Sequence, residues 1–143
     1  MLDTIIPPLT LDDIEEAARL AHPGTRAMEA VRRALLSDRA MRTLVDSSVH
    51  DMDRMPDGVR PPYVNVAGGY DEDDAQSVLL FTYAWGRSYI VADTIAVRIA
   101  AIMESGAAGA WTAEDVESFS PTLGEKWPPV VVVSRFRIRA DLV

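Results

Sequence analysis

The chain has 143 residues, a formal net charge of −8 and no cysteine. That length fits one domain, and an apolar fraction of 48% excludes a wholly disordered chain. The lack of cysteine excludes disulfides, thiolate metal sites and a cysteine nucleophile. No run of 18 residues is apolar throughout, so we expect no membrane span, and the N-terminus shows no signal-peptide pattern.

The first 24 residues are predicted to precede the main domain (residues 25–143) as an arm and an extra helix. Pro7 and Pro8 favour an extended arm, because proline and its predecessor disfavour helical geometry. Thr10 is predicted to cap the helix that follows, whose acidic first turn suits the helix dipole. Residues 22–24 are expected to end this helix.

Two more helices are predicted before the first strand. The first covers about residues 26–36, where apolar residues recur at helical spacing. A shorter helix follows with Ser37 as its cap, and residues 47–48 are expected to close it.

Three strand signals come next. Residues 49–55 form a weak candidate, and residues 63–67 form a clear strand that we expect Gly68 and Gly69 to end. Residues 76–85 are apolar on both faces, which predicts a strand covered on both faces.

The next predicted element is a long helix over residues 89–104, capped by Ser88. Most of its polar residues form one narrow stripe, namely Thr94, Arg98 and Ser105. Apolar residues cover most of the remaining circumference of the helix. A surface helix of a monomer should have a wider polar face. We therefore expect a second burial surface, most simply a neighbouring subunit.

After a short element near residues 116–119, the sequence closes with a strand over residues 130–142, whose apolar and arginine residues alternate. The order of elements predicts an α+β fold. We expect a largely antiparallel sheet of about four to five strands with helices packed on one side, plus the N-terminal arm and helix.

The charge is unevenly distributed. Residues 46–74 hold 8 acidic and 2 basic residues, whereas the last strand is basic. The sharpest features are an acidic run and an arginine row, namely Asp71, Glu72, Asp73 and Asp74, and Arg135, Arg137 and Arg139. We interpret both as subunit or partner contacts. Two alternatives stay open: a solvated loop tip for the acids, and pairing within the chain or plain solvation for the arginines.

Three more residues are candidates for the same interface: Arg98 on the long helix, and Trp111 and Trp127 in segments flanked by glycine or proline. Loop tryptophans often anchor interfaces, although tryptophans that close a small core are at least as common.

The sequence shows no catalytic or metal-binding motif. His50 and Asp51 are neighbours on a predicted strand and should point to opposite faces, so they do not form a hydrolase pair. The run 71–74 lacks the glycine and the late glutamate of a calcium loop. We therefore expect no catalytic residue, no metal and no cofactor.

Several segments together match a known pattern. They are the helix 31–36 with Leu44-Val45, the weak strand Val49-His50-Asp51, the opening Pro62-Tyr63-Val64, the aromatic step 81–87, the helix 89–103, and the closing strand 134–139. In this order the chain resembles the tail terminator (tail completion) proteins of bacteriophages with long non-contractile tails. The resemblance covers residues 27–143, and residues 1–24 depart from it.

The resemblance implies a non-enzymatic virion protein that forms a ring, typically a hexamer, on the head-proximal end of the tail tube. Such a ring ends polymerisation of the major tail tube protein and joins the tail to a head-completion (stopper) protein. DNA passes through the ring as cargo, which agrees with an acidic chain that does not wrap nucleic acid.

Two other functions stay open at this point. The chain could be another neck protein, namely the head–tail stopper, or a small α+β ligand-binding module with a pocket under the helix 89–104. An enzyme is the least favoured class.

Overall fold

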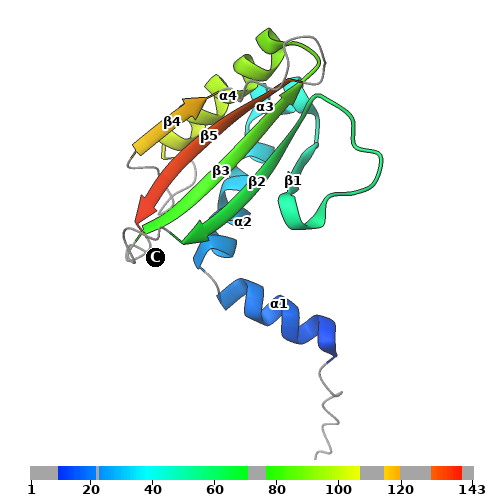
Figure 1. Ribbon diagram of the computed structural model, residues 1–143, viewed down its shortest axis with the longest axis vertical. Coiled ribbons are helices and arrows are strands. Elements are labelled where there is room, and N and C mark those ends of the chain that lie inside the picture. The colour runs from blue at the N-terminus through cyan, green and yellow to red at the C-terminus, as the bar shows by residue number, and fades with distance from the viewer. Residues whose placement is uncertain (1–9, 22, 71–76, 107–114, 120–129, 140–143) are drawn as a thin grey trace, which may run out of the picture.

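The computed structural model describes residues 10–21, 23–70, 77–106, 115–119 and 130–139 (Figure 1). Its elements are α1 (Leu11–Ala21), α2 (Pro23–Ser37), α3 (Arg39–Val45), β1 (Val49–Asp51), the 3-10 turn η1 (Met52–Arg54), β2 (Tyr63–Tyr70), β3 (Ser77–Gly86), α4 (Tyr89–Glu104), β4 (Asp115–Phe119) and β5 (Val130–Arg139). The fold is α+β, as the sequence predicts.

The strands that the structure describes form one sheet in the order β1-β2-β3-β5-β4. Three pairings are antiparallel, and β1 alone pairs in parallel with β2, so the sheet is largely antiparallel. Helices α2, α3 and α4 lie together behind the sheet in Figure 1. One face of the sheet is therefore covered by helices, as expected.

The core lies between this helix layer and the sheet. Strand β3 contributes alternate residues to it, and Val78, Leu80 and Ala84 are fully buried. Phe136 and Ile138 of β5 lie beside them in register. The opposite face of β3, with Phe81 and Trp85 among others, is half-buried. Alternation thus gives β3 one fully buried face and one partly covered face.

Helix α1 lies apart from the sheet, beyond the N-terminal end of α2 (Figure 1). It begins with the predicted cap: the Thr10 hydroxyl accepts from the Asp13 amide (3.1 Å), and the Asp13 carboxylate accepts from the Thr10 amide (3.0 Å). This reciprocal capping box satisfies amides that the first helical turn leaves unpaired.

The second and third helices begin at residues other than those predicted. Helix α2 begins at Pro23 rather than near residue 26, because the first helical position needs no amide hydrogen and suits proline. The cap of α3 is Asp38, not Ser37, and its carboxylate accepts from the Met41 amide at 2.9 Å. Ser37 ends α2 and donates to the Arg33 carbonyl.

The prediction that Gly68 ends a strand is wrong, because β2 continues to Tyr70. The glycine is needed for close packing instead: a Cβ at position 68 would lie 2.5 Å from the carbonyl oxygen of Gly24 in α2. The first strand candidate is also shorter than predicted. Strand β1 ends at Asp51, whose carboxylate accepts from the Asp53 amide and caps η1.

One buried hydroxyl gives a test of the core. Thr82 of β3 is fully buried, and its hydroxyl has no hydrogen-bond partner among the described residues. An unsatisfied buried hydroxyl is destabilising, so Thr82→Val should raise the free energy of unfolding by about 1 kcal/mol. Urea denaturation measures this, with the exposed Thr43→Val as the control that stays within about 0.5 kcal/mol. A lower stability of Thr82→Val would contradict the expectation.

Candidate assembly surface

The outward face of α4 is apolar. Six residues of this helix pack against the sheet and the other helices, namely Ala92, Ile95, Ala96, Ile99, Ile102 and Met103. On the opposite side, Ile90 is 76% exposed and Val97 is 62% exposed, and Tyr89 and Ala101 are exposed as well. The exposed stripe Ile90, Thr94, Val97 and Ala101 follows helical spacing. Part of the apolar surface of α4 is therefore exposed, and its burial in a neighbouring subunit stays a prediction.

A groove runs beside this stripe, between α3 and α4. It has a volume of about 780 Å³. Its lining includes Ala40, Thr43 and Leu44 of α3, and Val97 and Ala101 of α4. The groove is mostly apolar at its base, since Leu44 is half-buried there while Met41 and Val45 of the same helix are in the core.

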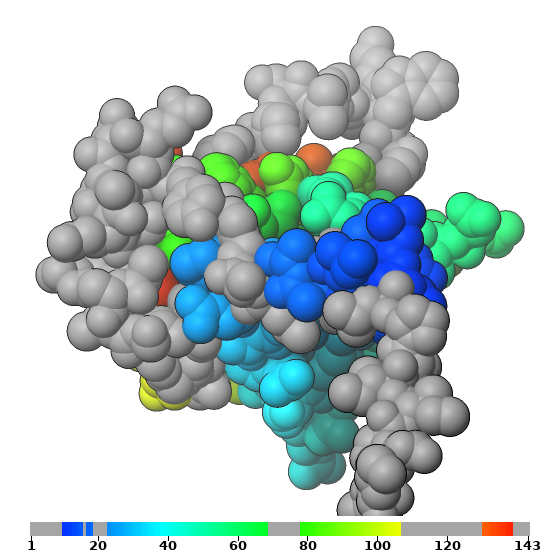
Figure 2. Space-filling model, turned by 90° about the horizontal axis from the view of Figure 1, so that it is seen from below, coloured from blue at the N-terminus to red at the C-terminus, as the bar shows by residue number. Residues whose placement is uncertain are grey.

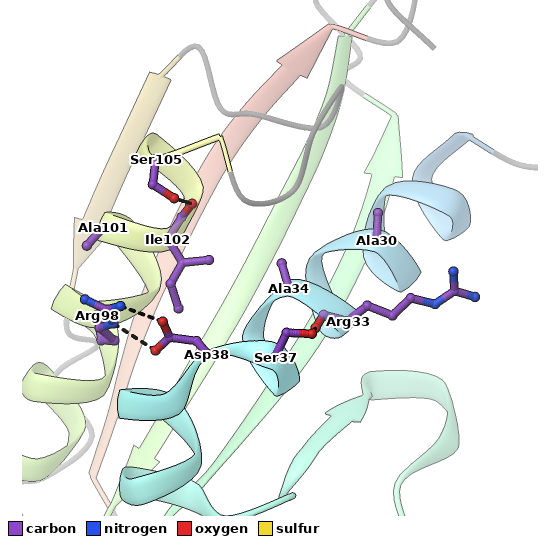
Figure 3. Close-up of a pocket in the computed structure, with 9 residues that line it drawn as sticks. All are labelled: Ala30, Arg33, Ala34, Ser37, Asp38, Arg98, Ala101, Ile102 and Ser105. Atoms are coloured by element: carbon purple, nitrogen blue, oxygen red, sulfur yellow. Dashed lines mark hydrogen bonds and ion pairs between the residues drawn. The ribbon is translucent and has the colours of Figure 1, made fainter.

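A second hollow lies between α2 and α4 and is shown in Figure 3. Its volume is about 490 Å³, and its walls include Ala30, Ala34 and Ile102. Arg33 extends away from it in Figure 3. Asp38 and Arg98 line both hollows and form an ion pair with each other, so the two hollows adjoin at this pair. We call the two hollows together the helix-layer groove.

Arg98 and Asp38 form a two-pronged ion pair across 60 residues of sequence. The Arg98 Nε donates to Asp38 Oδ2 at 2.9 Å, and its Nη2 donates to Oδ1 at 2.5 Å. The hydrogen bond from Arg98 holds the pKa of the Asp38 carboxyl below its ordinary value of 3.8, against a smaller opposing effect of burial. The predicted interface residue Arg98 is thus paired within the chain, although it stays 42% exposed.

This pair gives a prediction with an internal control. Asp38→Ala removes both the α3 cap and the ion pair, and we expect it to lower the free energy of unfolding by about 1–2 kcal/mol. Asp38→Asn keeps the capping oxygen but loses the charge and the second oxygen that accepts from Arg98, so its cost should be smaller, about 0.5 kcal/mol at neutral pH. Denaturation curves compare the two variants, and equal losses would contradict a separate capping role.

The pH dependence of the same pair has a defined direction. Because the folded state lowers the pKa of Asp38, the carboxylate contributes stability above its ordinary value of 3.8. That contribution is lost as the pH falls through the lower folded pKa. The stability difference between the wild type and Asp38→Asn should therefore shrink toward zero in this acidic range.

The arginine row lies in β5, on the face of the sheet away from the helices. Arg135 and Arg137 are half-buried. In register, Glu117 of β4 stands opposite Arg135, and Asp115 stands opposite Arg137. Opposite charges at facing positions can stabilise a sheet, so pairing within the chain stays one of the alternatives for the row. Arg139 stands opposite Ser77 of β3, and the role of the row in an interface stays a prediction.

Charge reversal separates these two roles of the arginine row. If the row pairs within the chain, Arg137→Glu places an acid opposite Asp115 and should lower the free energy of unfolding by about 1 kcal/mol without changing the mass of the assembly. Thermal melting and light scattering measure the two quantities. A smaller assembly with unchanged melting would assign the row to a subunit interface.

The remaining predicted interface residues lie outside the described residues: Asp71, Glu72, Asp73, Asp74, Trp111 and Trp127. The tryptophan that the structure does describe, Trp85, stacks on Tyr63 with ring centroids 5.8 Å apart and donates to the side chain of Asn65 at 2.8 Å. This cluster fixes the β2–β3 pairing on the half-buried face of the sheet.

In the described part of the chain, His50 and Ser48 are the two residues that most resemble part of a catalytic triad. The Ser48 hydroxyl lies 3.0 Å from His50 Nε2. Burial, with a smaller effect of Arg32, lowers the pKa of His50. Among the described residues, no carboxylate hydrogen-bonds to the other ring nitrogen, so the pair lacks the acid that orients the base in a triad.

The sequence predicted only the α4 side of the helix-layer groove. The apolar excess of α4 predicted its exposed stripe, but Asp38 was not singled out, and Leu44 was noted only in the Leu44-Val45 step of the resemblance. The signal for Asp38 was its place as an acid directly before a helix, three residues ahead of Met41. Its pairing with Arg98 carries no local signal.

Three further findings bear on the site. The described residues contain no cluster of three or more potential metal ligands, and their helices include none long and apolar enough to cross a membrane. Comparisons of the chain with protein-family models, with curated proteins and with solved structures find no match.

Proposed function

We propose that this protein is a structural virion protein that forms a ring on the head-proximal end of a phage tail tube. The ring ends polymerisation of the tube and offers the surface that joins tail to head. Its ring is a homo-oligomer, a hexamer by the resemblance, and its partners are the major tail tube protein and the head-completion protein. The exposed apolar stripe of α4 carries the proposal, together with the resemblance of residues 27–143 to tail terminators.

The stripe favours assembly because it exposes two large apolar side chains on one face of the helix, on either side of Thr94. Ile90 and Val97 are large apolar residues two turns apart on the same face, and the apolar base of the helix-layer groove lies beside Val97. Single exposed apolar residues are common on protein surfaces, whereas a stripe next to a groove is typical of an interaction site. Burying it in a neighbouring copy removes this apolar area from water.

The charge of the chain fits a ring through which DNA passes. A net charge of −8 repels the phosphate backbone and so opposes adhesion of DNA that moves through the lumen. DNA is then a passing cargo and not a ligand. That the acidic run 71–74 lines the lumen stays a prediction.

Particle mass and tube binding test the proposal. The purified chain should form a closed oligomer by light scattering and should cap one end of isolated tail tubes in electron micrographs. Binding to the head connector without binding to tubes would support the stopper function instead. A monomer at high concentration that does not bind tubes would overturn the proposal.

A ligand-binding module is the second candidate, since the helix-layer groove has polar and apolar walls. The groove flanks α4 rather than lying beneath it, because Ile95 and Ile99 on the underside are fully buried. A thermal-shift screen separates the two functions: a small molecule that raises the melting temperature of the monomer would favour the module.

A further inference from the structure

Helix α1 also carries an apolar stripe, and its residues are exposed. Leu11 is 73% exposed and Ile14 is 52% exposed, and Ala18, one turn further along, is exposed too. These three residues share a face at i, i+3 and i+7. In the space-filling view from below (Figure 2), the residues of α1 lie in front of the other described elements. An amphipathic helix in this position is built to bind a surface beyond its own chain.

The charges of α1 and of the helix-layer groove are opposite. The sequence of α1 contains four acidic residues and one basic residue. Glu15, which is exposed, follows Ile14 directly and flanks the apolar stripe. The groove between α3 and α4 has Arg39 in its lining, and Arg42 is exposed on the same short helix. Asp38 in the lining is already paired with Arg98, so on the α3 side of the groove the acidic helix meets basic residues. The acids Asp93 and Glu104 lie on the other side of the α4 stripe, around a separate hollow.

We propose that α1 of one copy docks in the α3–α4 part of the helix-layer groove of the next copy. Leu11, Ile14 and Ala18 then contact Leu44 and Val97 of the neighbour, and Glu15 lies toward Arg39. The inference rests on the proposed function, since it names the contact that links neighbours in the ring. Two different surfaces meet in this contact, and such a head-to-tail interface generates rings when its rotation closes.

The lengths of the two surfaces agree. Leu11 to Ala18 spans about 10 Å along its helix at 1.5 Å per residue, and so does Ile90 to Val97 along α4. The apolar face of α1 therefore matches the part of the exposed stripe from Ile90 to Val97, and the stripe continues for one more turn to Ala101.

The chain's own α1 does not reach this groove. Helix α1 joins the N-terminal end of α2, whereas α3 follows the C-terminal end (Figure 1). The 15 residues of α2 separate the two by about 22 Å. The 11 residues of α1 span about 16 Å, so α1 folded back along α2 would stop short of α3. Helix α1 of the same chain is thus not the occupant of this groove.

Cysteine cross-linking tests this contact cleanly, because the chain has no cysteine of its own. Full-length Ile14→Cys and Val97→Cys are purified separately, mixed and oxidised. We expect a disulfide-linked dimer of the two variants on a non-reducing gel. The control mixture pairs Ile14→Cys with Asp57→Cys, an exposed position outside the groove, and should give at least tenfold less dimer.

The outcomes separate this contact from the proposed function. A closed oligomer that gives no more 14–97 dimer than the control overturns the docking of α1 and leaves the ring intact. A wild-type chain that stays monomeric overturns both. A double variant, Ile14→Cys with Val97→Cys, that links only within one chain also overturns docking between copies.

A charge exchange gives a second, independent readout. Glu15→Arg and Arg39→Glu are each expected to weaken assembly at least tenfold, and the two variants mixed should recover most of it. The recovery should fade at high salt, because exposed charges are screened. Both positions are exposed, so the fold should not depend on them. Single variants that assemble like the wild type, or weakened variants whose mixture does not recover, would each overturn the pairing.

Discussion

Replacing Val97 by glutamate should split the assembly into single chains and leave the fold intact. Val97 is exposed in the free chain, so the carboxylate stays in water there and the monomer tolerates it. In the assembled state the same carboxylate would be buried against apolar side chains, which costs several kcal/mol. Asp93 and Glu104 lie on the same side of α4 and line a hollow with Val97, so they would add repulsion.

The size of this effect can be stated as an association constant. A cost of about 4 kcal/mol corresponds to roughly a thousandfold loss of affinity per contact, because each 1.4 kcal/mol is tenfold. Light scattering over a concentration series measures it, and thermal melting shows whether the fold is kept. The matched control is Met52→Glu, an exposed apolar residue on η1 outside the groove, which should assemble like the wild type. Loss of assembly in both variants would contradict a specific role of α4.

Local signals in the sequence were enough for most of the elements. Ser88 precedes α4 and caps it, with its hydroxyl accepting from the Val91 amide, and Thr10 caps α1 in the same way. The alternation in residues 130–139 likewise predicted that the arginines share one face of β5. Caps and periodicity depend on residues three or four apart, which is why a single sequence reveals them.

Contacts between distant segments could not be predicted in this way. The pairing of Arg98 with Asp38 and the close approach of Gly68 to Gly24 need the helices to be packed on the sheet first. The register that sets Asp115 opposite Arg137 needs the order of the strands. The sequence therefore predicted which residues carry charge or apolar surface, but not which of them meet.

The same limit applies to the assembly surface. Its α4 half follows from helical periodicity, because too many apolar residues surround one helix. Its α3 half depends on how a seven-residue helix sits beside α4, and nothing local in Ala40, Thr43 or Leu44 shows this. A groove is a property of two packed elements, so only the fold shows it.

The position of α4 depends on one glycine, and Gly86→Ala should destabilise the fold by about 2–3 kcal/mol. Gly86 is buried at the end of β3, where the chain turns back into the helix. An added Cβ would lie 2.6 Å from the backbone nitrogen of Ala92 and 2.9 Å from the carbonyl oxygen of Ser88. Both contacts are with backbone atoms of the first helical turn, so the methyl group fits only if α4 moves away from the sheet.

Gly58 serves as the comparison, because alanine there would cause backbone strain without a steric clash. A Cβ at Gly58 would meet nothing within 4 Å, but its φ of +77° is one that L side chains rarely adopt. Gly58→Ala should therefore cost only about 1 kcal/mol. Urea denaturation compares the variants, and a loss for Gly86→Ala no larger than that for Gly58→Ala would contradict the close approach.

Because α4 carries the exposed stripe, a displaced helix should also weaken assembly of Gly86→Ala at temperatures where the variant is still folded, whereas Gly58→Ala should assemble normally.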